Sequence, residues 1–174
     1  MKIFYFALLI LIGSDLYASD SIMLYKNIEL YSKKIESVFK EHNLSGLVDL
    51  MYPKVVSLMG GKQKTIGIIK QVESEILADG FTMNIDSVGH IIQLVKAGNE
   101  LHGIIPEYIY LKNEEGFLQQ TAYLMIISID DGETWSFIDT QGLIDDPSKI
   151  KMVFPNYNYD LRIPKKTKAI FYPK

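Results

Sequence analysis

The three histidines of this sequence, His42, His90 and His102, are the side chains best suited to chemistry near neutral pH. His42 follows a long helical pattern, where the helix dipole favours a cation, so we assign it no site. His90 and His102 lie on or near predicted strands and could approach one another if residues 82–95 pair with residues 100–111. Two imidazoles without a third ligand do not define a zinc site. We therefore expect no bound metal and no cofactor.

Carboxyl groups are the second possible source of chemistry. Asp86 and Glu107 are flanked by hydrophobic strand residues, and Asp49 lies on a predicted short helix. A carboxyl group with a raised pKa in an apolar pocket can move a proton beside a carbonyl group. A solvent-facing position is nevertheless the commoner one for an acid in an alternating strand or a helix. The sequence contains no cysteine, and its serines and glycines form no recognisable catalytic triad or phosphate-binding loop.

A row of tyrosines suggests a binding surface. Tyr108 and Tyr110 alternate with aliphatic residues, so they share one face of a predicted strand with His102. The row could line a pocket or a contact on the sheet face, and filling of the core or of an interface is the alternative. Together with the acids Asp86 and Glu107, these three residues form the predicted ligand-binding set.

A regular spacing marks the segment Ser128-x-Asp130-x-Gly132-x-Thr134-Trp135. It predicts a hairpin turn in which Asp130 accepts hydrogen bonds from turn amides and Gly132 adopts a positive φ. The spacing resembles the Asp-box hairpins of sialidases and related propellers, in which the box lies away from the active site. It occurs once here, in a chain too short for a propeller, so we expect it to stabilise the turn.

Helical periodicity dominates the first half of the chain. Apolar residues recur every three or four positions over residues 22–42 and 62–79, and Gly80 is placed to end the second of these helices. A short helix is predicted from Ser45 to Met51. Residues 55–59 are compatible with either a short strand or a turn.

The second half changes to the alternation typical of strands. Strands are predicted over residues 81–95, 100–111 and 117–129, and a hairpin follows to Asp139. Helices followed by an antiparallel meander predict an α+β fold with helices packed on a curved sheet. We expect a single domain with a core of residues 22–140 and an irregular C-terminal extension, 141–174, that contains a short helix.

The N-terminal residues 1–18 have the composition of a signal peptide. Lys2 precedes an apolar run over Ile3–Ile12, and Ala18 is a small residue at the expected cleavage site. A transmembrane helix needs about 20 apolar residues, so retention as an anchor is the weaker alternative. We expect a mature chain of residues 19–174 without a stable membrane anchor, exported to a bacterial periplasm or the medium. The absence of cysteine requires its core to be stable without disulfides.

The charge balance argues against a nucleic-acid-binding protein. The net charge is −3, whereas such proteins usually carry a concentrated basic surface. Basic residues cluster only near the C-terminus, and we favour a solvated edge there over a phosphate or membrane patch. These residues are Arg162, Lys165, Lys166, Lys168 and Lys174.

The order of elements resembles the nuclear transport factor 2-like superfamily, which includes ketosteroid isomerases and polyketide cyclases. A long helix, a short helix, the Gly60-Gly61 connection, a third helix and a curved sheet carry this resemblance over residues 22–140. Residues 52–61, 103–106 and 128–139 look most like its secreted bacterial members. The resemblance implies a cone-shaped fold with a pocket between the helices and the concave sheet face. Its catalytic members use a pocket Asp, Glu or His, but no residue here matches such a motif.

The predicted strand 121–129 is apolar on both faces, although the predicted helices suffice to cover one face only. We therefore expect a homodimer through the outer face of the sheet. The sequence favours an exported, non-catalytic protein that binds a small apolar ligand or a protein partner. The alternatives are an isomerase, dehydratase or cyclase with one pocket acid or histidine, and an envelope subunit without a ligand.

Overall fold

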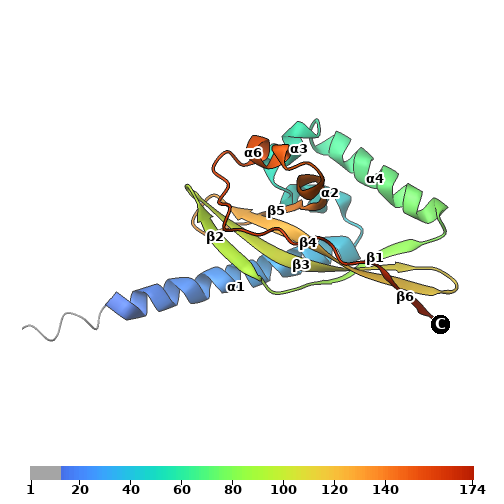
Figure 1. The fold of residues 1–174 in the computed structure, drawn as a ribbon, viewed down its shortest axis with the longest axis horizontal. Helices are drawn as coiled ribbons and strands as arrows, with labels where there is room; N and C mark the ends of the chain where they lie inside the picture. The colour runs from blue at the N-terminus through green and yellow to red at the C-terminus, as the bar shows by residue number, and fades with distance from the viewer. Residues whose placement is uncertain (1–12) are drawn as a thin grey trace, which may run out of the picture.

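The computed structural model describes residues 13–174, except for the side chains of residues 13–21 and 84–86. Helices precede a strongly curled antiparallel sheet (Figure 1), which confirms the predicted α+β class with N-terminal helices on a curved sheet. The helices are α1 (Gly13–Lys40), α2 (Leu44–Leu50), α3 (Pro53–Leu58), α4 (Lys62–Ala78), α5 (Gln141–Asp145) and α6 (Ser148–Val153). The strands are β1 (Thr82–Val88), β2 (Gln93–Ala97), β3 (Glu100–Lys112), β4 (Gly116–Ser128), β5 (Ser136–Asp139) and β6 (Ile170–Pro173).

The helices largely follow the predicted periodicity. Residues 1–12 of the predicted signal peptide lie outside the described residues, and α1 begins at Gly13. Gly80 adopts a φ of 82° just after α4, as predicted for the end of that helix. Residues 53–58 form α3 rather than a strand, since Pro53 occupies a first-turn position that lacks a helical hydrogen-bond acceptor. No helix among residues 13–174 is long and apolar enough to span a membrane.

The sheet is built on the long hairpin of β3 and β4. The strands β1 and β2 both pair with β3, and β5 and β6 both pair with β4. The predicted strand 81–95 is therefore two strands, and the interruption faces Pro106 of β3. Proline has no amide hydrogen to donate, and a Cβ atom on Gly89 would lie 2.5 Å from the Pro106 ring.

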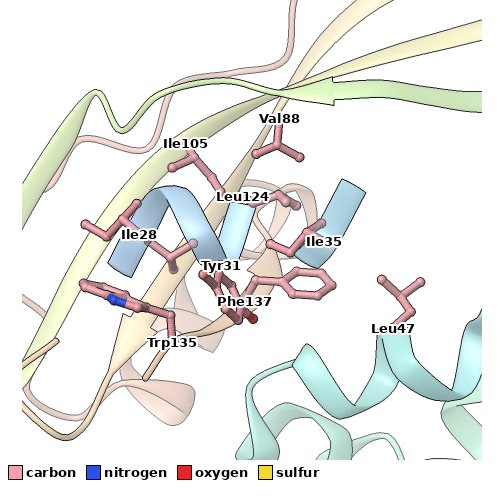
Figure 2. Packing of buried hydrophobic residues seen from close by; sticks show 10 residues of the cluster. Ile28, Tyr31, Ile35, Leu47, Val88, Ile105, Leu124, Trp135 and Phe137 are labelled. Carbon is pink, nitrogen blue, oxygen red and sulfur yellow. The ribbon is translucent and has the colours of Figure 1, made fainter. Parts of the chain in front are cut away.

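The two faces of the sheet carry separate hydrophobic cores. On the inner face, Ile28, Tyr31 and Ile35 of α1 pack toward the sheet (Figure 2). The other buried members of the inner core are Leu47, Val88, Ile105, Leu124, Ile126, Trp135 and Phe137. The outer core contains Tyr52, Ile104, Met125, Ile127, Ile138, Leu143, Val153, Phe154 and Leu161. Successive core residues of β3, β4 and β5 belong to the two cores in turn, because neighbouring side chains of a β-strand point to opposite faces of the sheet.

The C-terminal extension covers much of the outer face. Leu143 of α5, Val153 of α6 and the following residues Phe154 and Leu161 are buried against it. The sequence predicts helices that cover only one face of the sheet and a partner subunit on the other. In the structure, the C-terminal extension itself covers much of the outer face. A homodimer would have to use the part of the outer face beyond this cover.

Candidate functional site

The predicted ligand-binding residues lie on different parts of the sheet. His102 follows the alternation of Ile104 and belongs to the outer face, whereas Glu107 follows Ile105 and belongs to the inner face. Tyr108 and Tyr110 lie farther along the outer face, beside Thr121 and Gln119 of β4. Asp86 lies in β1, and its side chain is outside the described part of the structure. The structure therefore does not bring the predicted set together in one pocket.

Glu107 is the most deeply buried acid among the described residues. It pairs across the sheet with Val88 and Ala122, and only 4% of its surface is exposed. Burial, and to a smaller extent the charge of Asp139, raises the pKa of its carboxyl group to about 8. The carboxyl group is consequently protonated and neutral at pH 7. It has the chemistry of a proton donor, which is the role considered for it from the sequence.

His102 belongs to a buried polar cluster on the outer face. Its Nε2 lies 2.8 Å from Oε2 of Glu100, and the hydroxyl group of Tyr52 donates to the other oxygen of that carboxylate at 3.2 Å. Burial lowers the pKa of His102, although the hydrogen bond and charge of Glu100 act in the opposite direction. The ring of Phe154 packs 5.1 Å from the imidazole and separates it from solvent. The rings of Tyr52 and His102 therefore form part of the surface against which Phe154 of the C-terminal cover packs.

The two histidines that the sequence suggested as a pair are separated. His90 is exposed in the connection between β1 and β2, beside α1, whereas His102 is fully buried on the opposite face. Among the described residues, no group of three or more histidine, aspartate and glutamate side chains is arranged to hold a metal ion.

The Asp-box segment forms the predicted turn. Asp130 accepts hydrogen bonds from the amide of Thr134 at 2.9 Å and from the hydroxyl group of Ser128 at 2.7 Å. Gly132 has a φ of 94°, and its amide donates to the Ser128 hydroxyl oxygen at 2.8 Å. Asn27 of α1 donates to the Gly132 carbonyl oxygen at 3.0 Å. The turn thus closes on itself and is also hydrogen-bonded to α1, and none of residues 128–135 lines either of the two clefts described below.

Asp130→Ala is expected to destabilise the protein by about 1–2 kcal/mol, because several hydrogen bonds to the charged, partly exposed carboxylate of Asp130 are lost. Urea unfolding measures the change. Glu133→Ala is the matched control, since Glu133 is an exposed acid in the same turn. Equal stability of the two variants would show that the spacing of this segment has no structural role.

A cleft opens where the helices meet the start of the sheet. It lies between the end of α1, the start of α2, the end of α4 and the start of β1, and its volume is about 330 Å³. We call it the helix cleft. Its apolar lining consists of Val38, Phe39, Leu44, Leu47, Leu77, Phe81 and Met83. Its polar lining residues are Lys40, His42, Glu73 and Thr82. Sequence reasoning missed this site because its residues come from two segments, 38–47 and 73–83, that only the packing of α4 beside α1 and α2 brings together.

A second groove follows α1 on the side of the β1–β2 connection, with a volume of about 700 Å³. Ile28, Val88 and Ile91 line it together with several charged residues of α1. Two of its acids already have partners. Glu36 accepts a hydrogen bond from the Val88 amide at 2.8 Å, and Glu29 pairs with Lys33 at 2.9 Å. The lining of this groove contains four charged side chains, Lys26, Glu29, Lys33 and Glu36, whereas that of the helix cleft contains two, Lys40 and Glu73.

Comparison with known proteins adds no relative from which a role could be inferred. The chain matches no family model, no curated protein and no solved structure among those with which it was compared.

Proposed function

We propose that this chain is an exported, non-catalytic protein that binds a small apolar ligand in the helix cleft. The observation that carries the proposal is an apolar cleft of about 330 Å³ between three helices and the sheet. Small-molecule sites are typically concave, mostly apolar and about 300–1,000 Å³ in volume. The cleft is at the small end of this range, so it suits a compact ligand.

The lining supports a ligand with an apolar body and a polar end. Seven of the eleven lining residues are apolar, and the polar ones include one base, one acid and His42. Leu77 is 64% exposed, although it is an aliphatic residue in an amphipathic helix. Covering such a side chain with a ligand removes apolar surface from water, which is favourable.

The proposal also includes membership of a protein superfamily and a homodimeric assembly. The helices followed by a curled sheet support membership of the nuclear transport factor 2-like superfamily, whose members typically hold a pocket between these layers. A homodimer through the uncovered part of the outer sheet face remains a prediction. The mass of the protein in solution tests it.

Leu77→Glu is expected to weaken binding of the neutral apolar probe N-phenyl-1-naphthylamine by at least about tenfold, because a charge replaces an apolar contact. Probe fluorescence during titration measures the affinity. Leu58→Glu is the matched control, since Leu58 is a leucine of similar exposure, 56%, that does not line the helix cleft.

Two outcomes would contradict the proposed site. Unchanged probe binding by Leu77→Glu would place the ligand elsewhere, and an equal loss in Leu58→Glu would indicate non-specific surface adsorption. Native mass spectrometry of the purified protein provides an independent test. A retained small molecule that is lost in Leu77→Glu would support the site directly.

Glu107 supports a second candidate function, an isomerase, dehydratase or cyclase that transfers a proton. The specific observation is a neutral carboxyl group buried on the inner sheet face. Glu107 is not among the residues that line the helix cleft, so a ligand bound there would not contact it. This separation favours binding without turnover.

A further inference from the structure

The last thirteen residues form a basic segment on a protein of negative net charge. Residues 162–174 contain five lysine or arginine side chains and no acid, whereas the whole chain has a net charge of −3. All five of these cations are exposed. Within the described part of the chain, none of them forms an ion pair within 4.0 Å. The segment therefore presents uncompensated positive charge to solvent.

The same segment carries exposed apolar residues. The strand β6 pairs with the first residues of β4 at the end of the sheet that carries the C-terminus (Figure 1). Its side chains Ile170, Phe171 and Tyr172 are 56%, 44% and 40% exposed. Lys168 lies two residues before Ile170, the first residue of the strand, and Lys174 follows the strand directly, so this short apolar strand is flanked by lysines.

An aromatic row continues this surface across the sheet. Phe117 of β4 stacks on Tyr172 with a centroid distance of 5.0 Å, and Tyr110 of β3 lies 5.7 Å from Phe117 on its other side. Lys112 is the register partner of Phe117 and adds a further cation. The buried residues under the C-terminal cover do not include this row. We call this surface the distal face, formed by Tyr110, Lys112, Phe117, Ile170 and Tyr172 with the lysines beside β6, which are Lys165, Lys166, Lys168 and Lys174. Phe171 pairs with Leu118 and lies on the opposite face of the sheet.

We propose that the distal face docks onto an anionic lipid surface. Aromatic side chains favour the headgroup level of a bilayer, where an apolar ring and a polar group can both be accommodated. Each lysine near an anionic leaflet adds to the attraction, and basic residues combined with aromatic ones produce reversible surface binding. The negative charge of the rest of the molecule orients it with the distal face toward the membrane.

The geometry favours lipid over two other occupants. Proteins that bind single-stranded nucleic acid stack bases on free aromatic faces. Here the rings of Phe117 and Tyr172 stack on each other with an interplanar angle of 17°, so their facing surfaces are already occupied. A second copy joined edge to edge through β6 would bring the flanking lysines of the two chains together, and charged residues and proline protect edge strands from such pairing.

The proposal concerns a surface separate from the helix cleft, so it holds or fails independently of the ligand proposed above. Sedimentation with vesicles of phosphatidylcholine, with and without phosphatidylglycerol, tests it. We expect binding to the anionic vesicles only, and release as salt is added, because salt screens the attraction. The triple variant Lys165→Gln, Lys166→Gln, Lys168→Gln should lower the partition coefficient by about a hundredfold.

The control is Lys34→Gln, Lys64→Gln, Lys70→Gln, which removes the same charge from exposed lysines of α1 and α4. It should bind the anionic vesicles as the wild type does. Tyr172→Ser should weaken binding about tenfold while leaving the salt dependence unchanged, since it removes an aromatic ring of the distal face and no charge. Circular dichroism checks that each variant is folded.

Several results would overturn the proposal. One is equal binding to neutral vesicles, and another is a triple lysine variant that binds like its control. Preference for a single-stranded oligonucleotide over the vesicles would assign the surface to nucleic acid. A dimeric mass that Tyr172→Ser converts to a monomer would assign it to a second copy of the chain.

Discussion

Glu107→Gln is expected to abolish most of the loss of stability that the wild-type protein shows as the pH rises from about 4.5 to about 8. In the folded protein the pKa of Glu107 is raised to about 8, from its ordinary value of 4.5. The buried neutral carboxyl group therefore contributes its full stability below pH 4.5. As the pH rises, the unfolded chain gives up this proton first. Between these pH values the folded state keeps a proton that the unfolded state has lost, so the free energy of unfolding decreases as the pH rises.

The expected magnitude is large for one side chain. The difference between the two pKa values corresponds to about 5 kcal/mol, comparable with the lower end of the total stability of a small domain. Urea unfolding at several pH values measures the slope. Glu114→Gln is the control, because Glu114 is an exposed acid in the turn between β3 and β4. A Glu107→Gln protein with the wild-type slope would show that the carboxyl group is not buried as described.

Phe154→Ala is expected to destabilise the protein by about 3–5 kcal/mol, the usual cost of truncating a buried phenylalanine. Phe154 is fully buried, stacks on Tyr52 with a centroid distance of 5.3 Å and contacts His102. The substitution leaves a cavity beneath the C-terminal cover and admits water to the imidazole of His102. Urea unfolding followed by the fluorescence of Trp135 gives the difference in free energy.

Tyr159→Ala is the matched control, because Tyr159 is an aromatic residue of the same segment whose ring is largely exposed. It should change the stability by less than about 1 kcal/mol. A similarly small effect of Phe154→Ala would mean that the C-terminal extension does not seal the outer face. The whole outer face would then require a partner subunit to cover it.

The sequence alone determined the features that depend on neighbours along the chain. The periodicity of α1 and α4 and the Gly80 cap predicted helices that the structure contains. The Asp130 spacing predicted its turn, and alternation placed His102 and Tyr110 on the same strand face. Each of these features depends on the 3.6-residue or two-residue period, or on hydrogen bonds within a few residues.

Only the tertiary structure decided which of these elements meet. Residues 141–163 have weak periodicity, so nothing in their pattern indicated that Phe154 and Leu161 would seal the outer face. Glu107 was recognised as a candidate acid, but its burial depends on α1 packing over strands far away in the sequence. The helix cleft likewise arises where four element ends converge. Such contacts are set by packing over the whole chain, which local periodicity does not encode.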